Sequence, residues 1–264
     1  MTPDILKRMA DAARARVEEE KRVLSHGKLL ELAAAARTPY DFRAAFLPDG
    51  ARVIAEIKLA SPSRGDIAPG ADPVSTARSY LSAGAAAVSV LTEPDFFKGS
   101  SAYLRRVREA CPDARLLMKD FFVDEYQIAK ARADGADCVL LMLSVLGGER
   151  TALFMRKARE LGLSCLVEVH DERELEAAAE AGADLIGVNN RDLRTLKTDP
   201  GVSLRLAARA PKHAVLISES GLDSGRDISV LRAAGYRGFL VGTSLMRERD
   251  PGAALRRLLE EARA

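Results

Sequence analysis

Hydrophobic residues recur along the chain in eight short runs, and a longer stretch with helical spacing separates each run from the next. The runs are 53–58, 86–91, 115–119, 137–141, 165–169, 185–188, 215–218 and 238–241. Short runs that are mostly apolar are typical of parallel strands covered on both faces. Eight strand–helix units in one chain therefore predict an α/β fold, a closed (β/α)8 TIM barrel.

A glycine precedes every second run, which gives the chain a weak internal repeat. These glycines are Gly84, Gly135, Gly182 and Gly235. Glycine suits the left-handed position that ends a helix before the next strand. The repeat predicts a double strand–helix unit used four times. A doubly wound open sheet is the alternative, although no Gly-x-Gly-x-x-Gly motif opens the first helix.

The first part of the chain has a different pattern. Residues 4–47 are rich in Ala, Arg, Glu and Leu, which predicts helix throughout, and Pro39 and Pro48 mark the end of this region. We therefore expect one domain over residues 1–264. Within it, residues 1–47 form an N-terminal helical extension, a lid over one end of the barrel formed by residues 48–264.

Charge and hydropathy limit the classes of partner. Of the 264 residues, 30% are charged, with a formal net charge of +2 and no basic stripe interleaved with aromatics. We therefore expect no nucleic-acid partner. The charged N-terminus lacks the apolar stretch of a signal peptide, and no apolar run approaches the ~20 residues of a membrane span. These features predict a cytoplasmic protein without membrane contact.

Cysteine and histidine residues show no metal-site spacing. Cys111, Cys138 and Cys165 are widely separated, as expected for free thiols in a reducing compartment. The histidines are His26, His170 and His213. They are scattered, so we expect structural or surface roles for them and no bound metal.

The first run carries two opposite charges at its end. Glu56 and Lys58 are two residues apart and therefore project from the same face of a strand. Removing both charges from water costs several kcal/mol for each before any pairing offsets it. A pair kept at such a place indicates a functional site, with a structural ion pair as the alternative.

Polar residues also stand at or just after the ends of other runs. They are Lys119, Glu168, Asn189, Glu219, Ser220, Gly242 and Thr243. The carboxyl ends of the strands meet at one rim of a barrel, so we expect these residues to converge there. Lysines and carboxylates brought together at one mouth suit general acid–base chemistry.

The loops after the last two runs suggest a phosphate site. Residues 219–221 (Glu-Ser-Gly) and 242–246 (Gly-Thr-Ser-Leu-Met) resemble loops that bind phosphate through backbone N–H groups and a short helix. Ordinary turn glycines are the alternative. The pattern predicts a small phosphate ester as substrate.

Six segments carry a more specific pattern. They are 55–63 (Ala-Glu-Ile-Lys-Leu-Ala-Ser-Pro-Ser), 91–100 (Leu-Thr-Glu-Pro-Asp-Phe-Phe-Lys-Gly-Ser), 117–121 (Leu-Met-Lys-Asp-Phe), 167–169 (Val-Glu-Val), 189–193 (Asn-Asn-Arg-Asp-Leu) and 218–221 (Ser-Glu-Ser-Gly). In this order, and over essentially the whole chain, they resemble the indole-3-glycerol phosphate synthase family. The resemblance implies ring closure, decarboxylation and dehydration of 1-(2-carboxyphenylamino)-1-deoxyribulose 5-phosphate in tryptophan biosynthesis. It implies no metal and no organic cofactor.

The resemblance also implies roles for individual residues. Lys119 would polarise the ketone oxygen, and Glu168 and Glu56 would take a proton or stabilise the cation on the anilino nitrogen. Lys58 would aid dehydration or hold phosphate, and the division of labour between the two lysines stays open. Asn189 and Ser220 would contact the sugar hydroxyls, and Glu219 would orient the lysines. Arg191 would bind the anthranilate carboxylate, and the aromatic pocket would be lined by Phe97, Phe121 and Leu140. The phosphate would be held by Ser61, Gly221, Gly242 and Thr243.

Two positions depart from the family pattern: Leu59 replaces a common basic residue, and Thr243 replaces a common serine but keeps the hydroxyl. A phosphoribosyl isomerase on the same fold and a non-enzymatic phosphate-binding barrel are the alternative functions. The isomerase would share the phosphate site but would not need the Glu56–Lys58 pair together with Lys119 and Glu168. The non-enzymatic barrel predicts the loss of at least one charged rim residue, and none is missing here. The expected partner is the phosphorylated small molecule. The oligomeric state stays open, with a monomer as the simplest expectation.

Overall fold

Eight parallel strands form a closed barrel in the computed structural model, which describes residues 5–263. The strands are β1 (Arg52–Ile57), β4 (Ala87–Leu91), β5 (Leu116–Lys119), β6 (Cys138–Met142), β7 (Ser164–Val169), β8 (Leu185–Asn189), β9 (Val215–Glu219) and β10 (Gly238–Val241). Each pairs with its neighbours in chain order, and β1 closes the ring by pairing with both β10 and β4. The closed ring confirms the predicted barrel and excludes the open sheet.

Side chains alternate between the interior and the exterior of the barrel, as strand geometry requires. On β1, Ile54 belongs to the inner apolar cluster, whereas Val53 and Ala55 belong to the cluster between the strands and the outer helices. Continuing this alternation, Glu56 and Lys58 fall on the inner face. Both line the cavity at the carboxyl ends of the strands.

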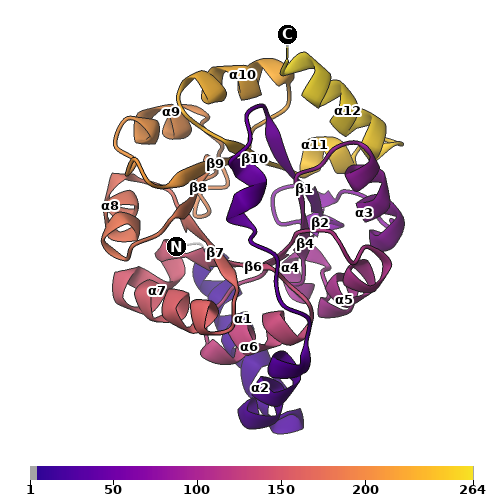
Figure 1. Cartoon of the computed structure of the whole chain (residues 1–264), viewed down its shortest axis with the longest axis vertical. Coiled ribbons are helices and arrows are strands. Elements are labelled where there is room, and N and C mark those ends of the chain that lie inside the picture. Colours follow the sequence, from indigo (N-terminus) through magenta and orange to yellow (C-terminus); the bar gives the residue numbers. More distant parts are fainter. Residues whose placement is uncertain (1–4, 264) are drawn as a thin grey trace.

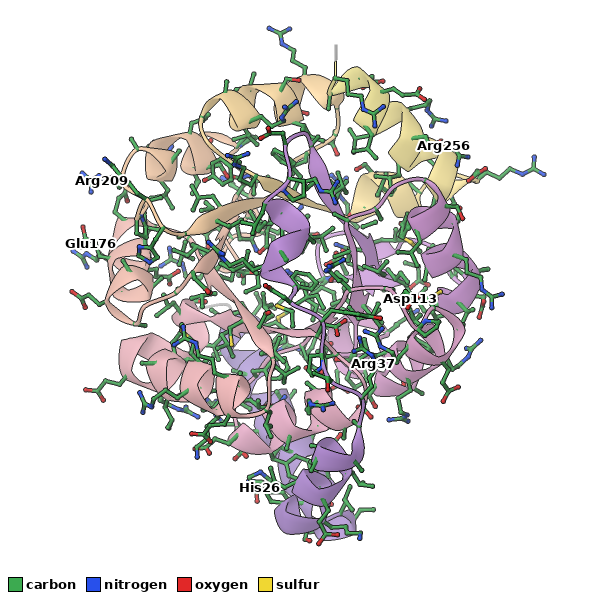
Figure 2. The ribbon with its side chains drawn as sticks, viewed as in Figure 1. His26, Arg37, Asp113, Glu176, Arg209 and Arg256 are labelled. Atoms are coloured by element: carbon green, nitrogen blue, oxygen red, sulfur yellow. The ribbon has the colours of Figure 1, made fainter. Side chains whose placement is uncertain are left out.

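Helices surround the barrel and form its outer layer (Figure 1). They are α3 (Pro73–Ser82), α5 (Ser101–Ala110), α6 (Glu125–Ala133), α7 (Leu143–Glu160), α8 (Glu172–Glu180), α9 (Gly201–Ala207), α10 (Gly225–Ala233) and α12 (Pro251–Glu261). Two further short helices, α4 (Pro94–Phe97) and α11 (Thr243–Met246), follow β4 and β10 and contribute residues to the cavity at the carboxyl ends of the strands. Charged side chains such as Glu176, Arg209 and Arg256 project outward from this layer (Figure 2). Among residues 5–263 no helix is long and apolar enough to cross a membrane.

The repeated glycines end helices, as their spacing predicts. Gly84, Gly135, Gly182 and Gly235 have φ values of 96°, 88°, 75° and 105°. After α3, the Ala85 N–H bonds to Tyr80 O and the Gly84 N–H bonds to Leu81 O, the pattern of a Schellman cap. Each of the other three glycines, together with the residue that follows it, makes the same pair of hydrogen bonds. The same helix end before every second strand explains why the glycines recur at regular intervals along the chain.

The N-terminal region is not helical throughout, contrary to prediction. It contains α1 (Ile5–Val23), α2 (His26–Ala35) and the 3-10 helix η1 (Arg43–Phe46), with a non-helical segment at 36–42. Pro39 lacks an N–H and disfavours helix at the residue before it. In place of a helical hydrogen bond, the backbone N–H of Tyr40 donates to Asp137 Oδ1 over 2.8 Å.

Residues 5–46 cover both ends of the barrel. Met9 of α1 lines the cavity at the carboxyl ends of the strands, whereas Phe46 of η1 packs against Gly238 at the first residue of β10. Figure 1 shows η1 as the dark indigo turn in front of the barrel, with α1 fainter behind it. The predicted lid therefore corresponds to α1, and η1 closes the opposite end.

Candidate active site

A cavity of about 500 Å³ opens at the carboxyl ends of the strands. It brings together all the residues that the sequence nominates for catalysis or binding. They are Glu56, Lys58, Ser61, Phe97, Lys119, Phe121, Leu140, Glu168, Asn189, Arg191, Glu219, Ser220, Gly221, Gly242 and Thr243. Their placement on one rim follows from the parallel strand order, and their chemical roles stay predictions.

Four charged side chains form one layer across the barrel mouth. Glu56, Lys119, Glu168 and Glu219 come from β1, β5, β7 and β9, the odd-numbered strands of the barrel. A barrel layer is built from alternate strands and is normally filled by branched apolar residues. Here the top layer is ionic. Glu56, Glu168 and Glu219 are all buried.

Lys119 is the centre of this layer. Its Nζ lies 2.6 Å from Glu219 Oε2 and 3.4 Å from Glu168 Oε2. Burial opposes the charged form of Lys119, but the negative charges of Glu219, Glu168 and Glu56 outweigh burial and raise the pKa of the ammonium group. Lys119 is therefore protonated throughout the neutral range.

The two carboxylates beside Lys119 differ in their proton affinity. Burial tends to raise the pKa of Glu168, but Lys119 and His170 overcome it and lower the pKa to about 2. Burial raises the pKa of Glu219 to about 7, against the effect of Lys119 and with the help of the Glu168 charge. Glu168 is thus a permanent carboxylate, and Glu219 is the group that titrates near neutrality.

Glu56 and Lys58 form the ion pair that their spacing predicts. Lys58 Nζ lies 2.6 Å from Glu56 Oε1, one residue beyond the end of β1. Ser89 on β4 donates to Glu56 Oε2 over 3.4 Å. The pair therefore faces the cavity with one carboxylate oxygen held by Lys58 and the other by the neighbouring strand.

Two glycines leave room for the buried carboxylates. A Cβ on Gly187, within β8, would lie 2.2 Å from Glu219 Oε1, and a Cβ on Gly242 would lie 2.6 Å from Glu56 Oε1. Gly187 is absent from the residues nominated by the sequence. The sequence feature that could have indicated its role is a glycine inside a strand, since such a glycine often marks the close approach of another group.

The loop after β8 holds Arg191 at the cavity. The Arg191 N–H donates to Asn189 Oδ1 over 3.0 Å, and its Nη1 donates to Leu196 O over 2.8 Å. Burial lowers the pKa of Arg191, and the nearby positive charge of Arg64 lowers it further. An anion between these two guanidinium groups would relieve their repulsion.

The predicted phosphate loops adjoin one another. Ser244 Oγ donates to Leu222 O over 3.3 Å, which ties the loop after β10 to the loop after β9. Ser220 and Gly221 have φ values of 67° and 73°, so the backbone turns sharply as β9 ends. Ser61 lies in the short hairpin of β2 (Ala60–Ser61) and β3 (Gly65–Asp66), which follows β1, the strand paired with β10.

Apolar side chains line another part of the mouth. The rings of Phe97 and Phe121 have centroids 6.4 Å apart, and Leu140 and Met9 also line the cavity. The buried Glu93 carboxylate accepts the N–H groups of Asp95, Phe96 and Phe97 and so fixes α4. This arrangement offers an apolar surface next to the charged layer.

Arg16 connects α1 to this side of the mouth. Its guanidinium lies 2.6 Å from Asp120 and 3.4 Å from Glu93. Arg16 is 77 positions from Glu93 and 104 positions from Asp120 in the chain, so no local sequence pattern signals the contact. Arg16 therefore anchors α1 beside the charged layer.

The described residues 5–263 contain no group of three or more His, Cys, Asp and Glu side chains arranged to hold a metal ion. Cys111, Cys138 and Cys165 are free and buried. The charged side chains that line the cavity are lysine, arginine, glutamate and aspartate side chains.

Comparison with known proteins identifies a family. The family model for indole-3-glycerol phosphate synthase matches residues 6–258. The protein named indole-3-glycerol phosphate synthase 2 of Streptomyces coelicolor is 45% identical over 255 residues, covering 97% of this chain and 98% of the relative. That of Laribacter hongkongensis is 50% identical over 210 residues, 79% of each chain. A solved 3-hexulose-6-phosphate synthase aligns with a TM-score of 0.64 at 17% identity, covering 80% of this chain and 99% of that chain, which shows the barrel fold alone.

Proposed function

Because the chain belongs to the indole-3-glycerol phosphate synthase family, we propose how the residues at its barrel mouth divide the work of that reaction. The enzyme is a carboxy-lyase of tryptophan biosynthesis. It closes the ring of 1-(2-carboxyphenylamino)-1-deoxyribulose 5-phosphate, releases carbon dioxide and then releases water. The observation that carries the proposal is the ammonium group of Lys119 held between two buried carboxylates in the cavity.

Lys119 acts first, on the ketone of the substrate. Ring closure joins the carboxylate-bearing ring carbon to the ketone carbon, and negative charge develops on the ketone oxygen. The Lys119 ammonium, which is protonated at neutral pH before the reaction, donates a hydrogen bond and then its proton to that oxygen. Glu219, 2.6 Å away, orients the ammonium group toward the substrate.

Glu168 and Glu56 act on the positive charge. As the ring closes and water later departs, the anilino nitrogen becomes cationic. Glu168 remains ionised because its pKa is lowered to about 2 by Lys119 and His170 in spite of burial. A fixed carboxylate in this dry site stabilises the cation and accepts the proton lost when the indole forms. Glu56 supports it from the opposite side of the layer.

Lys58 serves the dehydration step. The hydroxyl produced by ring closure needs a proton before it can leave as water, and Lys58 is the second ammonium group at the mouth. Its 2.6 Å pair with Glu56 holds it toward the cavity. Ser61 lies three residues further on, so Lys58 also adds charge to the phosphate end of the substrate.

The remaining residues bind the substrate. The two anionic ends of the molecule need separate cationic or N–H-rich places, and the cavity offers both. The proposed contacts are Arg191 for the anthranilate carboxylate, Asn189 and Ser220 for the sugar hydroxyls, Ser61, Gly221, Gly242 and Thr243 for the phosphate, and Phe97, Phe121 and Leu140 for the aromatic ring.

We further propose that the enzyme works as a monomer of one domain in the cytoplasm, without metal or organic cofactor. The three free, buried cysteines suit a reducing compartment.

The test of the function supplies the purified chain with the anthranilate-derived ribulose phosphate. Indole absorbance should appear together with one equivalent of carbon dioxide. Folded protein that leaves the substrate unchanged would overturn the proposal. A product that retains the carboxyl group would point instead to isomerase chemistry on the same fold.

A further inference from the structure

His170 lies against the carboxylate oxygen of Glu168 that Lys119 does not hold. The imidazole Nε2 and Glu168 Oε1 are 3.3 Å apart and form an ion pair, and both are buried atoms without a hydrogen-bond partner among the described residues. Lys119 Nζ is 3.4 Å from the other oxygen, Oε2. His170 does not line the cavity. It follows Glu168 by two positions, the same spacing that pairs Lys58 with Glu56. The two pairs differ because Lys58 faces the cavity.

A second carboxylate holds the other side of the imidazole. His170 Nδ1 is 3.1 Å from Glu174 Oε2, and the His170 N–H donates to the same oxygen over 2.8 Å. Glu174 belongs to the first turn of α8, which Asp171 caps. The ring is therefore fixed from the helix side and presents Nε2 to Glu168.

The imidazole carries a permanent charge in this place. Burial opposes protonation, but Glu168 and Glu174 outweigh it and raise the pKa of His170 to about 10. Histidine usually titrates near neutrality and acts as a switch. Between two carboxylates it becomes a fixed cation.

The ionic layer needs this second cation. Lys119 alone faces Glu168 and Glu219, with Glu56 also close enough to affect its charge. Two buried carboxylates sharing one ammonium group tend to retain a proton between them. A positive charge at Glu168 Oε1 decides which of the two stays ionised.

We propose that His170 is a positioning residue of the reaction, which holds Glu168 by Oε1, keeps it ionised and aims Oε2 at Lys119 and the substrate. This inference rests on the proposed role of Glu168. His170 touches no substrate and moves no proton in the cycle. The chain Lys119–Glu168–His170–Glu174 alternates in charge from the cavity to helix α8.

The first experiment compares His170→Asn and His170→Ala with a His26→Gln control. His26 is exposed on the α1–α2 projection, where its ring lies near Tyr126 of α6, and it does not line the cavity (Figure 2). Both substitutions remove the buried positive charge beside Glu168. We therefore expect kcat to fall about 10- to 100-fold with little change in KM. Asparagine should retain more activity than alanine, because its amide is a polar group that can face Glu168 Oε1, whereas alanine leaves that oxygen without a polar neighbour. His26→Gln should match the unsubstituted enzyme.

The pH profile separates positioning from a merely structural role. Removing the cation raises the pKa of the Glu168–Glu219 pair. In His170→Asn, the pH at which kcat falls on the acid side should therefore be about one pH unit higher than in the unsubstituted enzyme. The groups facing the pair are Lys119, Glu56 and His170, and only His170 changes. A Glu174→Gln variant should shift the limb in the same direction by less.

A measurement without turnover completes the test. Nitrogen NMR of the unsubstituted enzyme should show one imidazole doubly protonated at pH 8, and that signal should be missing in His170→Asn. A neutral His170 at pH 8 would overturn the inference, as would an active enzyme whose His170→Asn variant keeps its kcat and pH profile. An unsubstituted enzyme that fails to turn over substrate would instead overturn the proposed function, and the NMR result would still decide the state of His170.

Discussion

Lys119 Nζ lies 2.6 Å from Glu219 Oε2, and this contact spans the barrel mouth from the last residue of β5 to the last residue of β9. The two residues are 100 positions apart in the chain. The contact depends on the parallel arrangement of the strands, which brings their carboxyl ends to the same end of the barrel. It also places a cation next to a carboxyl group whose pKa burial raises to about 7.

Gly187→Ala tests the room that this contact needs. A methyl group at this position would lie 2.2 Å from Glu219 Oε1 and displace the carboxylate from Lys119. A misplaced catalytic group costs about 100-fold in rate, so we expect kcat to fall by that order with the fold retained. Steady-state kinetics and thermal unfolding measure the two effects.

Gly27→Ala is the matched control, because nothing lies within 4 Å of the added Cβ. Gly27 belongs to α2, where alanine favours helix, so kcat should stay unchanged and stability should rise slightly. If Gly187→Ala keeps its kcat within about twofold, the misplacement argument is wrong.

Glu219 should titrate near neutral pH in the free enzyme. Its pKa is raised to about 7, first by burial and then by the charge of Glu168, against the opposing effect of Lys119. Carbon NMR of labelled glutamate should show one carboxyl group with a midpoint near pH 7, and Glu219→Gln should remove that signal. Lys119→Met should move the midpoint upward, because it removes the cation that favours the carboxylate. A midpoint at the ordinary glutamate value would contradict the account.

Asp137 should matter for stability and not for chemistry. Asp137 is fully buried and directly precedes β6 in the chain. Its carboxylate accepts hydrogen bonds from Arg37 Nη1 and from the Leu116 N–H, each over 2.8 Å, and from Arg108 Nη2. Asp137→Asn leaves the buried Arg108 without its counter-charge, which costs about 3–5 kcal/mol of unfolding free energy. Denaturant unfolding measures that loss.

Asp49→Asn provides the comparison, since Asp49 makes a solvent-exposed pair with Arg237. Exposed pairs contribute about 0–1 kcal/mol, so this variant should be nearly as stable as the unsubstituted enzyme. Folded Asp137→Asn protein should retain kcat, because Asp137 does not line the cavity. A large fall in kcat at a temperature where it is folded would show that the two ends of the barrel are coupled.

The barrel and its charged rim were predictable because their signals are local. Apolar runs gave the strands, and Gly84 shows why the helix-ending glycines recur with the period of the fold. The rule that strand ends share one face then placed Lys119 and Glu168 together without any knowledge of contacts.

Other parts of the site depend on contacts that no local pattern records. Arg16 reaches Asp120 from 104 positions away. Gly187 matters only because Glu219, from the next strand, occupies the space its Cβ would fill. The break at 36–42 follows from Pro39 and from the buried Asp137 that accepts the Tyr40 N–H. His170 had the informative spacing from Glu168, but its position outside the cavity depends on how the loop after β7 packs on α8.

The central claim is that Lys119 starts the reaction, and Lys119→Ala tests it most directly. General acid catalysis contributes about 100- to 10,000-fold, so the variant should lose at least that much turnover of the anthranilate-derived ribulose phosphate. Its fold, checked by thermal unfolding, and its affinity for the substrate, checked by calorimetry, should be largely kept. A folded Lys119→Ala protein that still forms indole-3-glycerol phosphate at close to the unsubstituted rate would contradict the account.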